Sequence, residues 1–184
     1  MLDDIASLTI RINEALDRIE RCFPGPLRLY SCLAEGAHRL VAKQVLLRSN
    51  SGLCVPLPLP VEEYATDFAS QGSRAEFFGL LAKATEVIQM TPQPARRQAY
   101  QEAGRFIIEH SRVLLAIWDG QRARGLGGTG QVIAMAREGG LPLAWIFARN
   151  GTPSEDPNDN PGLVYERFPD NYMDGPERLT RKAQ

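Results

Sequence analysis

Short apolar segments alternate with amphipathic helical segments along most of this chain. In residues 4–22, apolar side chains recur at three- and four-residue steps, from Ile5 to Ile19, and therefore share one helix face. Residues 113–118 are apolar without alternation, which is typical of a strand covered on both faces. This alternation predicts an α/β protein with a Rossmann-like three-layer fold, in which helices cover both faces of a mostly parallel sheet.

The order of the expected elements follows from the same periodicities and from the turn residues between them. We expect helices over residues 4–22, 38–48, 61–69, 73–84, 95–110 and 129–138. We expect strands over residues 27–33, 53–57, 86–90, 113–118 and 143–147, and a short edge strand over 163–168. Residues 1–150, with an N-terminal helix in 1–24, then form one domain, and the turn-rich residues 151–184 form a polar loop and C-terminal tail.

Composition excludes several classes of function. The 184 residues carry a net charge of −1, so no global basic excess attracts nucleic acid. No apolar run reaches the roughly 18–20 residues of a membrane span, and the acidic N-terminus is unlike a signal peptide. Cys22, Cys32 and Cys54 lack metal-ligand spacing and suit buried, reduced thiols. We therefore expect a cytoplasmic protein without a metal, a required cofactor or a membrane partner.

Two loops that follow expected strands are rich in small residues. Ligands of open parallel sheets bind beyond the carboxyl ends of the strands, where these loops lie. The first loop contains Ala34, Gly36 and Ala37, and a helix follows it at once. The second loop leads into another helix and contains Gly125, Gly127, Gly128, Thr129 and Gly130. Small residues and helix N-termini let backbone N–H groups approach an anion, so we predict a two-part phosphate cradle.

Polar side chains near these loops are candidate ligand contacts. Ser31 and Glu35 flank the first loop, although Glu35 also suits a solvated loop charge. Tyr64 and Asp67 lie three residues apart, on one side of a helix, where Tyr64 can equally pack on the sheet edge. Arg105 is a further candidate, which can bind a phosphate or can simply be solvated on a helix surface. Asp119 is another, which can accept a hydrogen bond from a sugar hydroxyl or from the N–H groups of the loop.

Five sequence blocks between residues 27 and 147 occur in a characteristic order: "SCLAEGAHRLVAKQVL", "VPLPLPVEEYATDF", "SRAEFFGLLAKA", "AYQEAGRFIIEHSRVLLAIWDG" and "RGLGGTGQVIAMAREGGLPLAWI". Together they closely resemble the SLOG superfamily, which joins the DNA-processing Smf/DprA proteins and the Lonely Guy phosphoribohydrolases. The resemblance is nearest to bacterial members often found beside antiviral or stress-signalling genes. It implies a Rossmann-like fold that binds a nucleotide or a nucleotide-derived ligand.

The sequence departs from this family at its start. Such relatives usually open with a strand that ends in Gly-His-Arg and precedes the helix found here at 4–22. Its absence leaves three alternatives: an over-trimmed start, direct pairing of 27–33 with 113–118, or a strand lent by a partner.

The sequence also departs from the family in its loops. The glycine loop of Lonely Guy enzymes has a pattern similar to P-G-G-x-G-T-x-x-E, whose Glu is catalytic. When Gly128 and Thr129 are aligned with the Gly-Thr of that motif, Val132 takes the position of this Glu. An aliphatic side chain cannot act as an acid or base. Cys32 and His38 also replace the usual Gly and Asp of the first loop.

Three functions remain open from the sequence. The first is a non-catalytic domain that senses a nucleotide or an ADP-ribose-like signal, forms a homo-oligomer and serves bacterial defence or stress signalling. Paired cradle loops and the absence of a convincing base–nucleophile pair favour it. The second is a nucleotide-processing hydrolase that uses Glu35, Asp67 or Asp119. The third is single-stranded DNA binding of the DprA type, which the near-neutral charge disfavours.

Overall fold

The computed structural model describes residues 5–120, 128–148 and 162–169. Its helices are α1 (Ile5–Cys22), α2 (Ala37–Leu46), α3 (Val61–Ala65), α4 (Gln71–Leu81), α5 (Arg96–His110) and α6 (Thr129–Glu138). Its strands are β1 (Leu27–Tyr30), β2 (Ser51–Leu57), β3 (Glu86–Gln89), β4 (Leu114–Trp118), β5 (Leu143–Phe147) and β6 (Leu163–Glu166). Every expected helix and strand is present, with shifted ends at several of them.

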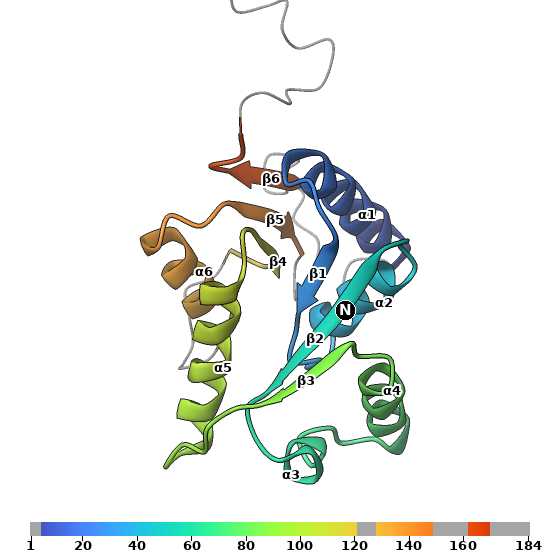
Figure 1. Cartoon of the computed structure of the whole chain (residues 1–184), viewed down its shortest axis with the longest axis vertical. Coiled ribbons are helices and arrows are strands. Elements are labelled where there is room, and N and C mark those ends of the chain that lie inside the picture. Colours follow the sequence, from blue (N-terminus) through green and yellow to red (C-terminus); the bar gives the residue numbers. More distant parts are fainter. Residues whose placement is uncertain (1–4, 121–127, 149–161, 170–184) are drawn as a thin grey trace, which may run out of the picture.

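The strands form two small sheets, and the helices lie on both sides of them (Figure 1). Strands β1, β2 and β3 pair in that order and are all parallel, with Leu29 opposite Leu53. Strands β4 and β5 are parallel, with Ile117 opposite Ile146, and β6 joins β5 in the antiparallel direction. The predicted α/β, Rossmann-like fold is confirmed. The expected edge strand near residue 163 is also present, so part of the predicted loop and tail contributes to a sheet.

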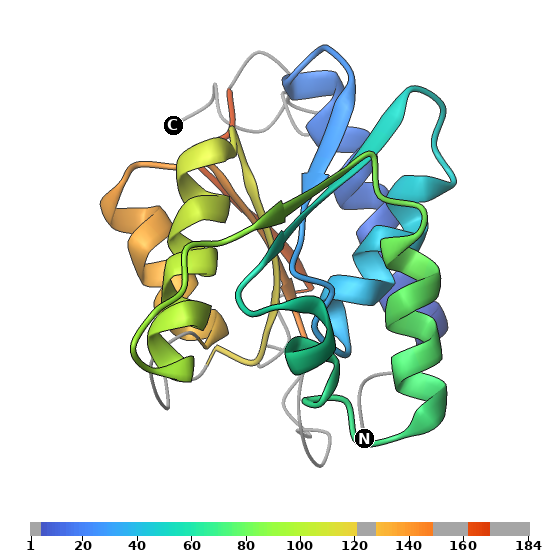
Figure 2. The ribbon, with the colours of Figure 1, turned by 60° about the horizontal axis from the view of Figure 1, so that its bottom comes forward.

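Strands β1 and β4 do not pair with each other. Among the strands that the structure describes, each is the outer strand of its own sheet and pairs on one edge only, β1 with β2 and β4 with β5. Of the three alternatives for the missing first strand, the direct pairing of 27–33 with 113–118 is therefore wrong. The two strands instead line opposite sides of one cavity, which separates their facing edges. Figure 2 shows both strands between the helices α2 and α5.

The apolar periodicities of the helices correspond to the buried faces. The apolar stripe of α1, including Leu8 and Ile12, packs with Val45 of α2 and Ile146 of β5. A second cluster places the aromatic ring of Phe77 from α4 beside β2. The three cysteines are buried and free, as expected. Across the described residues, none of the helices combines the length and the apolar character needed to span a membrane.

Candidate functional site

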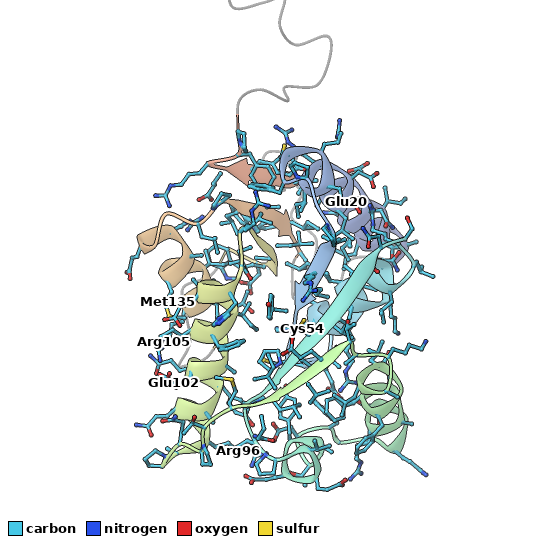
Figure 3. The ribbon with its side chains drawn as sticks, in the orientation of Figure 1. Glu20, Cys54, Arg96, Glu102, Arg105 and Met135 are labelled. Carbon is cyan, nitrogen blue, oxygen red and sulfur yellow. The ribbon has the colours of Figure 1, made fainter. Side chains whose placement is uncertain are left out.

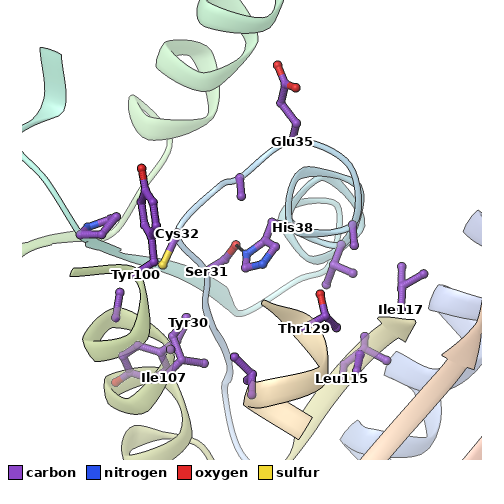
Figure 4. A pocket seen from close by; sticks show the side chains of 18 of the residues that line it. Tyr30, Ser31, Cys32, Glu35, His38, Tyr100, Ile107, Leu115, Ile117 and Thr129 are labelled. Carbon is purple, nitrogen blue, oxygen red and sulfur yellow. Dashed lines mark hydrogen bonds between the residues drawn. The ribbon is translucent and has the colours of Figure 1, made fainter. Parts of the chain in front are cut away.

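A cavity of about 420 Å³ lies between β1 and β4 and opens toward the loops that follow them (Figure 4). Its deep walls are apolar and come from β1, β4, α2 and α5. Most of its polar lining side chains gather where the strands end, and these are Ser31, Glu35, His38, Tyr64, Asp67, Tyr100 and Thr129, whereas Tyr30 lines it from within β1. The cavity therefore has an apolar interior and a polar rim, which is a common composition of small-molecule sites.

The N-termini of two helices reach this cavity. Helix α2 begins after Gly36, whose φ is +80°, and helix α6 begins after Gly128. Glycine has no side chain to cap the first helical turn, so neither helix has a side-chain cap at this position. Ala37 and Thr129, the first residues of α2 and α6, both line the cavity. Two positive helix ends thus face the same space, an arrangement that favours an anion.

A buried arginine holds the turn between β1 and α2. Leu33 has a φ of +57°, an unusual conformation for a residue other than glycine, and it is fully buried. Arg39, only 2% exposed, donates from Nε to the Leu33 carbonyl at 2.9 Å. It also donates from Nη1 to the Ser73 carbonyl at 2.9 Å and to a carboxylate oxygen of Glu76 at 2.9 Å. The Ser73 hydroxyl in turn donates to Glu35. Sequence reasoning missed Arg39, because no motif marks an arginine that folds back onto its own loop.

Ser31 and His38 form a hydrogen-bonded pair in the cavity wall. Ser31 Oγ lies 3.2 Å from His38 Nδ1 and also accepts the Leu33 N–H at 3.2 Å (Figure 4). His38 is exposed toward the open cavity, yet the surrounding walls desolvate its ring and lower its pKa. The sequence showed no convincing base–nucleophile pair, since these residues are seven positions apart. The tertiary turn brings this serine and this histidine together.

Asp67 belongs to a tight polar cluster at the rim. The Tyr100 hydroxyl donates to one carboxylate oxygen of Asp67, and Arg96 Nη2 donates to the other at 2.5 Å. Arg96 also donates to Tyr100 Oη at 2.8 Å and to Glu63 at 2.9 Å. Burial, with the bond to Asp67, raises the pKa of Tyr100 to about 12. Because Arg96 is shared by two carboxylates, it offers little charge to a phosphate.

The structure brings many of the predicted contacts together. Seven of them line the cavity: Ser31, Ala34, Glu35, Ala37, Tyr64, Asp67 and Thr129. Gly36 and Gly128 immediately precede the two helices, whereas Asp119 and Gly130 are not among the lining residues. Gly125 and Gly127 lie outside the described residues.

Tyr64 and Arg105 show opposite relations to the cavity. Tyr64 is 3% exposed and packs edge-on against Phe68 and Phe77, which matches its structural alternative. Arg105 is not a lining residue. It lies on the exposed face of α5, where it pairs with Glu102 at 2.5 Å and with Glu109 at 2.9 Å (Figure 3). The structure therefore keeps Tyr64 at the site and leaves Arg105 away from it.

The charge at the cavity comes from carboxylate side chains and from the positive N-terminal ends of two helices. Among the described lining residues there is no lysine or arginine, while Glu35 and Asp67 carry carboxylates. Val132 lines the cavity one turn after the start of α6. Within the described part of the chain, no group of three or more potential metal ligands forms.

No protein-family model matches this sequence, and no curated protein matches it at a significant level.

Proposed function

We propose that this chain is a SLOG-like domain that binds a nucleotide or a nucleotide-derived ligand at the rim of the cavity. One observation carries the proposal. The glycine-preceded N-termini of α2 and α6 converge on the same cavity, through Ala37 and Thr129, near the ends of β1 and β4. Helix N-termini at this place in a parallel α/β fold suit a phosphate group.

The electrostatics favour a ligand with little negative charge. A polyphosphate would meet the carboxylates of Glu35 and Asp67 without a lysine or arginine among the described lining residues to offset it. A nucleoside monophosphate, or a nucleotide derivative with similar charge, places one anionic group at the helix ends. Its ribose hydroxyls can then donate to Glu35, which is exposed.

Val132 supports a role without phosphoribohydrolase chemistry. Its side chain lines the cavity at the position where the Lonely Guy motif carries a glutamate. An isopropyl group cannot protonate a leaving base or activate water. Ligand binding without this cleavage is the function that these residues support, and a resulting change in the state of a homo-oligomer is part of the proposal.

DNA binding has less support, because Arg96 and Arg105 are both engaged by carboxylates.

Thermal shift and calorimetry with a panel of nucleosides, nucleoside monophosphates, cyclic nucleotides and ADP-ribose derivatives test this proposal. A ligand at one hundred times its dissociation constant adds about 2.7 kcal/mol of stability. Ala37→Asp places a carboxylate at the N-terminus of α2, beside the predicted phosphate position. We expect it to weaken a nucleoside monophosphate at least tenfold and to leave the matching nucleoside unchanged.

Ala75→Asp is the matched control, because Ala75 is exposed on α4 and does not line the cavity. Equal weakening by both substitutions would exclude a phosphate at the α2 end. The absence of binding by every member of the panel would count against the proposal as a whole.

A further inference from the structure

The hydrogen-bonded pair Ser31 and His38 has the parts of a nucleophilic site. We propose that Ser31 is a nucleophile activated by His38, and that the pair cleaves carboxylic esters or thioesters whose apolar acyl group enters the cavity. This inference does not require nucleotide binding, since it rests on the pair and on the apolar interior, and it shares only the N-terminus of α2 with the proposed anion site.

The hydrogen bonds around Ser31 leave its hydroxyl proton available to His38. The Leu33 N–H can only donate, so Ser31 Oγ accepts it at 3.2 Å, and His38 Nδ1 lies at 3.2 Å from the same oxygen. In the histidine tautomer that carries its proton on Nε2, Nδ1 accepts the Ser31 proton, and the proposal requires this tautomer. The lowered pKa keeps His38 neutral near pH 7, which is the state a general base requires.

The turn that joins the two residues is strained and firmly held. Leu33 is a non-glycine residue in the left-handed region, and Arg39 fixes its carbonyl from a buried position. Backbone strain of this kind persists where the surrounding structure enforces it, and it occurs preferentially at functional sites. Here it turns the chain from β1 into α2 so that Ser31 faces the first turn of the helix.

The cavity supplies the remaining requirements of ester cleavage. Its apolar interior, which extends from the serine between β1 and β4, is lined by Leu29, Val41, Ile107, Leu115 and Ile117. An acyl chain of a few carbons suits these walls. The N-terminus of α2 directs N–H groups toward the same space, where negative charge develops on the carbonyl oxygen. Burial raises the pKa of neighbouring Cys32 to about 12, so its thiol does not compete as a thiolate.

The reaction balances with water as the only co-reactant. Ser31 Oγ bonds to the carbonyl carbon while its proton passes to His38 Nδ1. The bond from that carbon to the leaving oxygen or sulfur breaks, and the leaving alcohol or thiol takes the proton from His38. Water then attacks the acyl-serine ester and gives a proton to His38, which returns it to Ser31 as the carboxylic acid leaves.

Covalent labelling of the full chain with a fluorophosphonate tests the nucleophile directly. Attack by Ser31 forms an O–P bond and releases fluoride, and the modified peptide is identified by mass spectrometry. We expect a single label on Ser31 and hydrolysis of p-nitrophenyl butyrate faster than of the acetate, because the longer acyl group fills more of the apolar interior. The labelling rate should rise with pH through a His38 pKa below 6.5.

Variants separate a catalytic pair from a structural one. His38→Gln should slow labelling and hydrolysis about a hundredfold or more, and Ser31→Ala should abolish both. Ser111→Ala, at the end of α5 and away from the cavity lining, should behave as the wild type. A wild-type chain without label on Ser31 overturns the proposal, even if a variant fails to fold. Wild-type labelling rates in His38→Gln overturn the role of the histidine.

Discussion

Arg39 holds the carbonyl of Leu33 from a position six residues further along the chain, at 2.9 Å. The bond crosses the turn between β1 and α2 and lies almost wholly out of solvent. The same guanidinium ties this turn to α4 through Ser73 and Glu76. One buried cation thus connects the rim of the cavity to the body of the fold.

Removal of this cation should destabilise the protein. Arg39→Met leaves the buried Leu33 carbonyl without its donor, and bonds to charged groups contribute about 1.5–3 kcal/mol each. We expect a loss of about 2–3 kcal/mol in the free energy of unfolding, measured by urea denaturation. Arg74→Met, on the exposed face of α4, should change it by less than about 0.5 kcal/mol. Similar losses in both variants would contradict a special role for Arg39.

Gly104 permits the close contact between α5 and α6. A Cβ atom at this position would lie 3.1 Å from Cγ2 of Val132. Gly104→Val should therefore cost about 1–3 kcal/mol through overpacking, and Val132→Ala in the same chain should recover part of this loss. Gly79→Val in α4, where a Cβ meets nothing within 4 Å, is the control. A double mutant no more stable than Gly104→Val would show that Val132 is not the obstacle.

The stability should fall as the pH drops below the ordinary pKa of histidine. Desolvation of the His38 ring by the cavity walls lowers its pKa, so the unfolded chain binds this proton first, and folding stability rises with pH in this range. The stability that neutral His38 contributes is complete above about pH 6.5, and it is lost as the pH falls through the pKa of His38 in the folded protein.

Urea denaturation at pH 7 and pH 5.5 measures this effect. His38→Gln should show a smaller difference between the two pH values than the wild type. An equal pH dependence in both proteins would assign it to other groups.

The facing edges of β1 and β4 should exchange their amide hydrogens rapidly. Each of these strands is bonded on one edge only, whereas β2 and β5 are bonded on both. Hydrogen exchange followed by NMR should find Val55 and Ile146, both fully buried, among the slowest amides. About half of the amides of β1 and β4, those on the unpaired edge of each strand, should exchange faster than the amides of β2 and β5. Uniform protection of all four strands would mean that another segment occupies the space between the sheets.

Local pattern predicted much of the candidate site. The small residues after β1 and before α6 were expected to face one crevice, and Ala34, Ala37 and Thr129 do line one cavity. Strand ends and helix starts are local features, so a single sequence can place such loops. The Ser31–His38 and Asp67–Tyr100 pairs were not predicted, because the first depends on the shape of a turn and the second on how the segment after α3 meets α5 in space.

The sequence by itself determined the order of the helices and strands, since the periodicity of apolar side chains is a local property that does not depend on which elements later pack against it. It also marked which residues are buried, such as the apolar stripe of α1. Only the tertiary structure decided that β1 and β4 remain apart, and that Arg105 faces its own helix neighbours and not the cavity. Sheet edges and ion pairs depend on which partners come within reach, and that is set by packing of the whole chain.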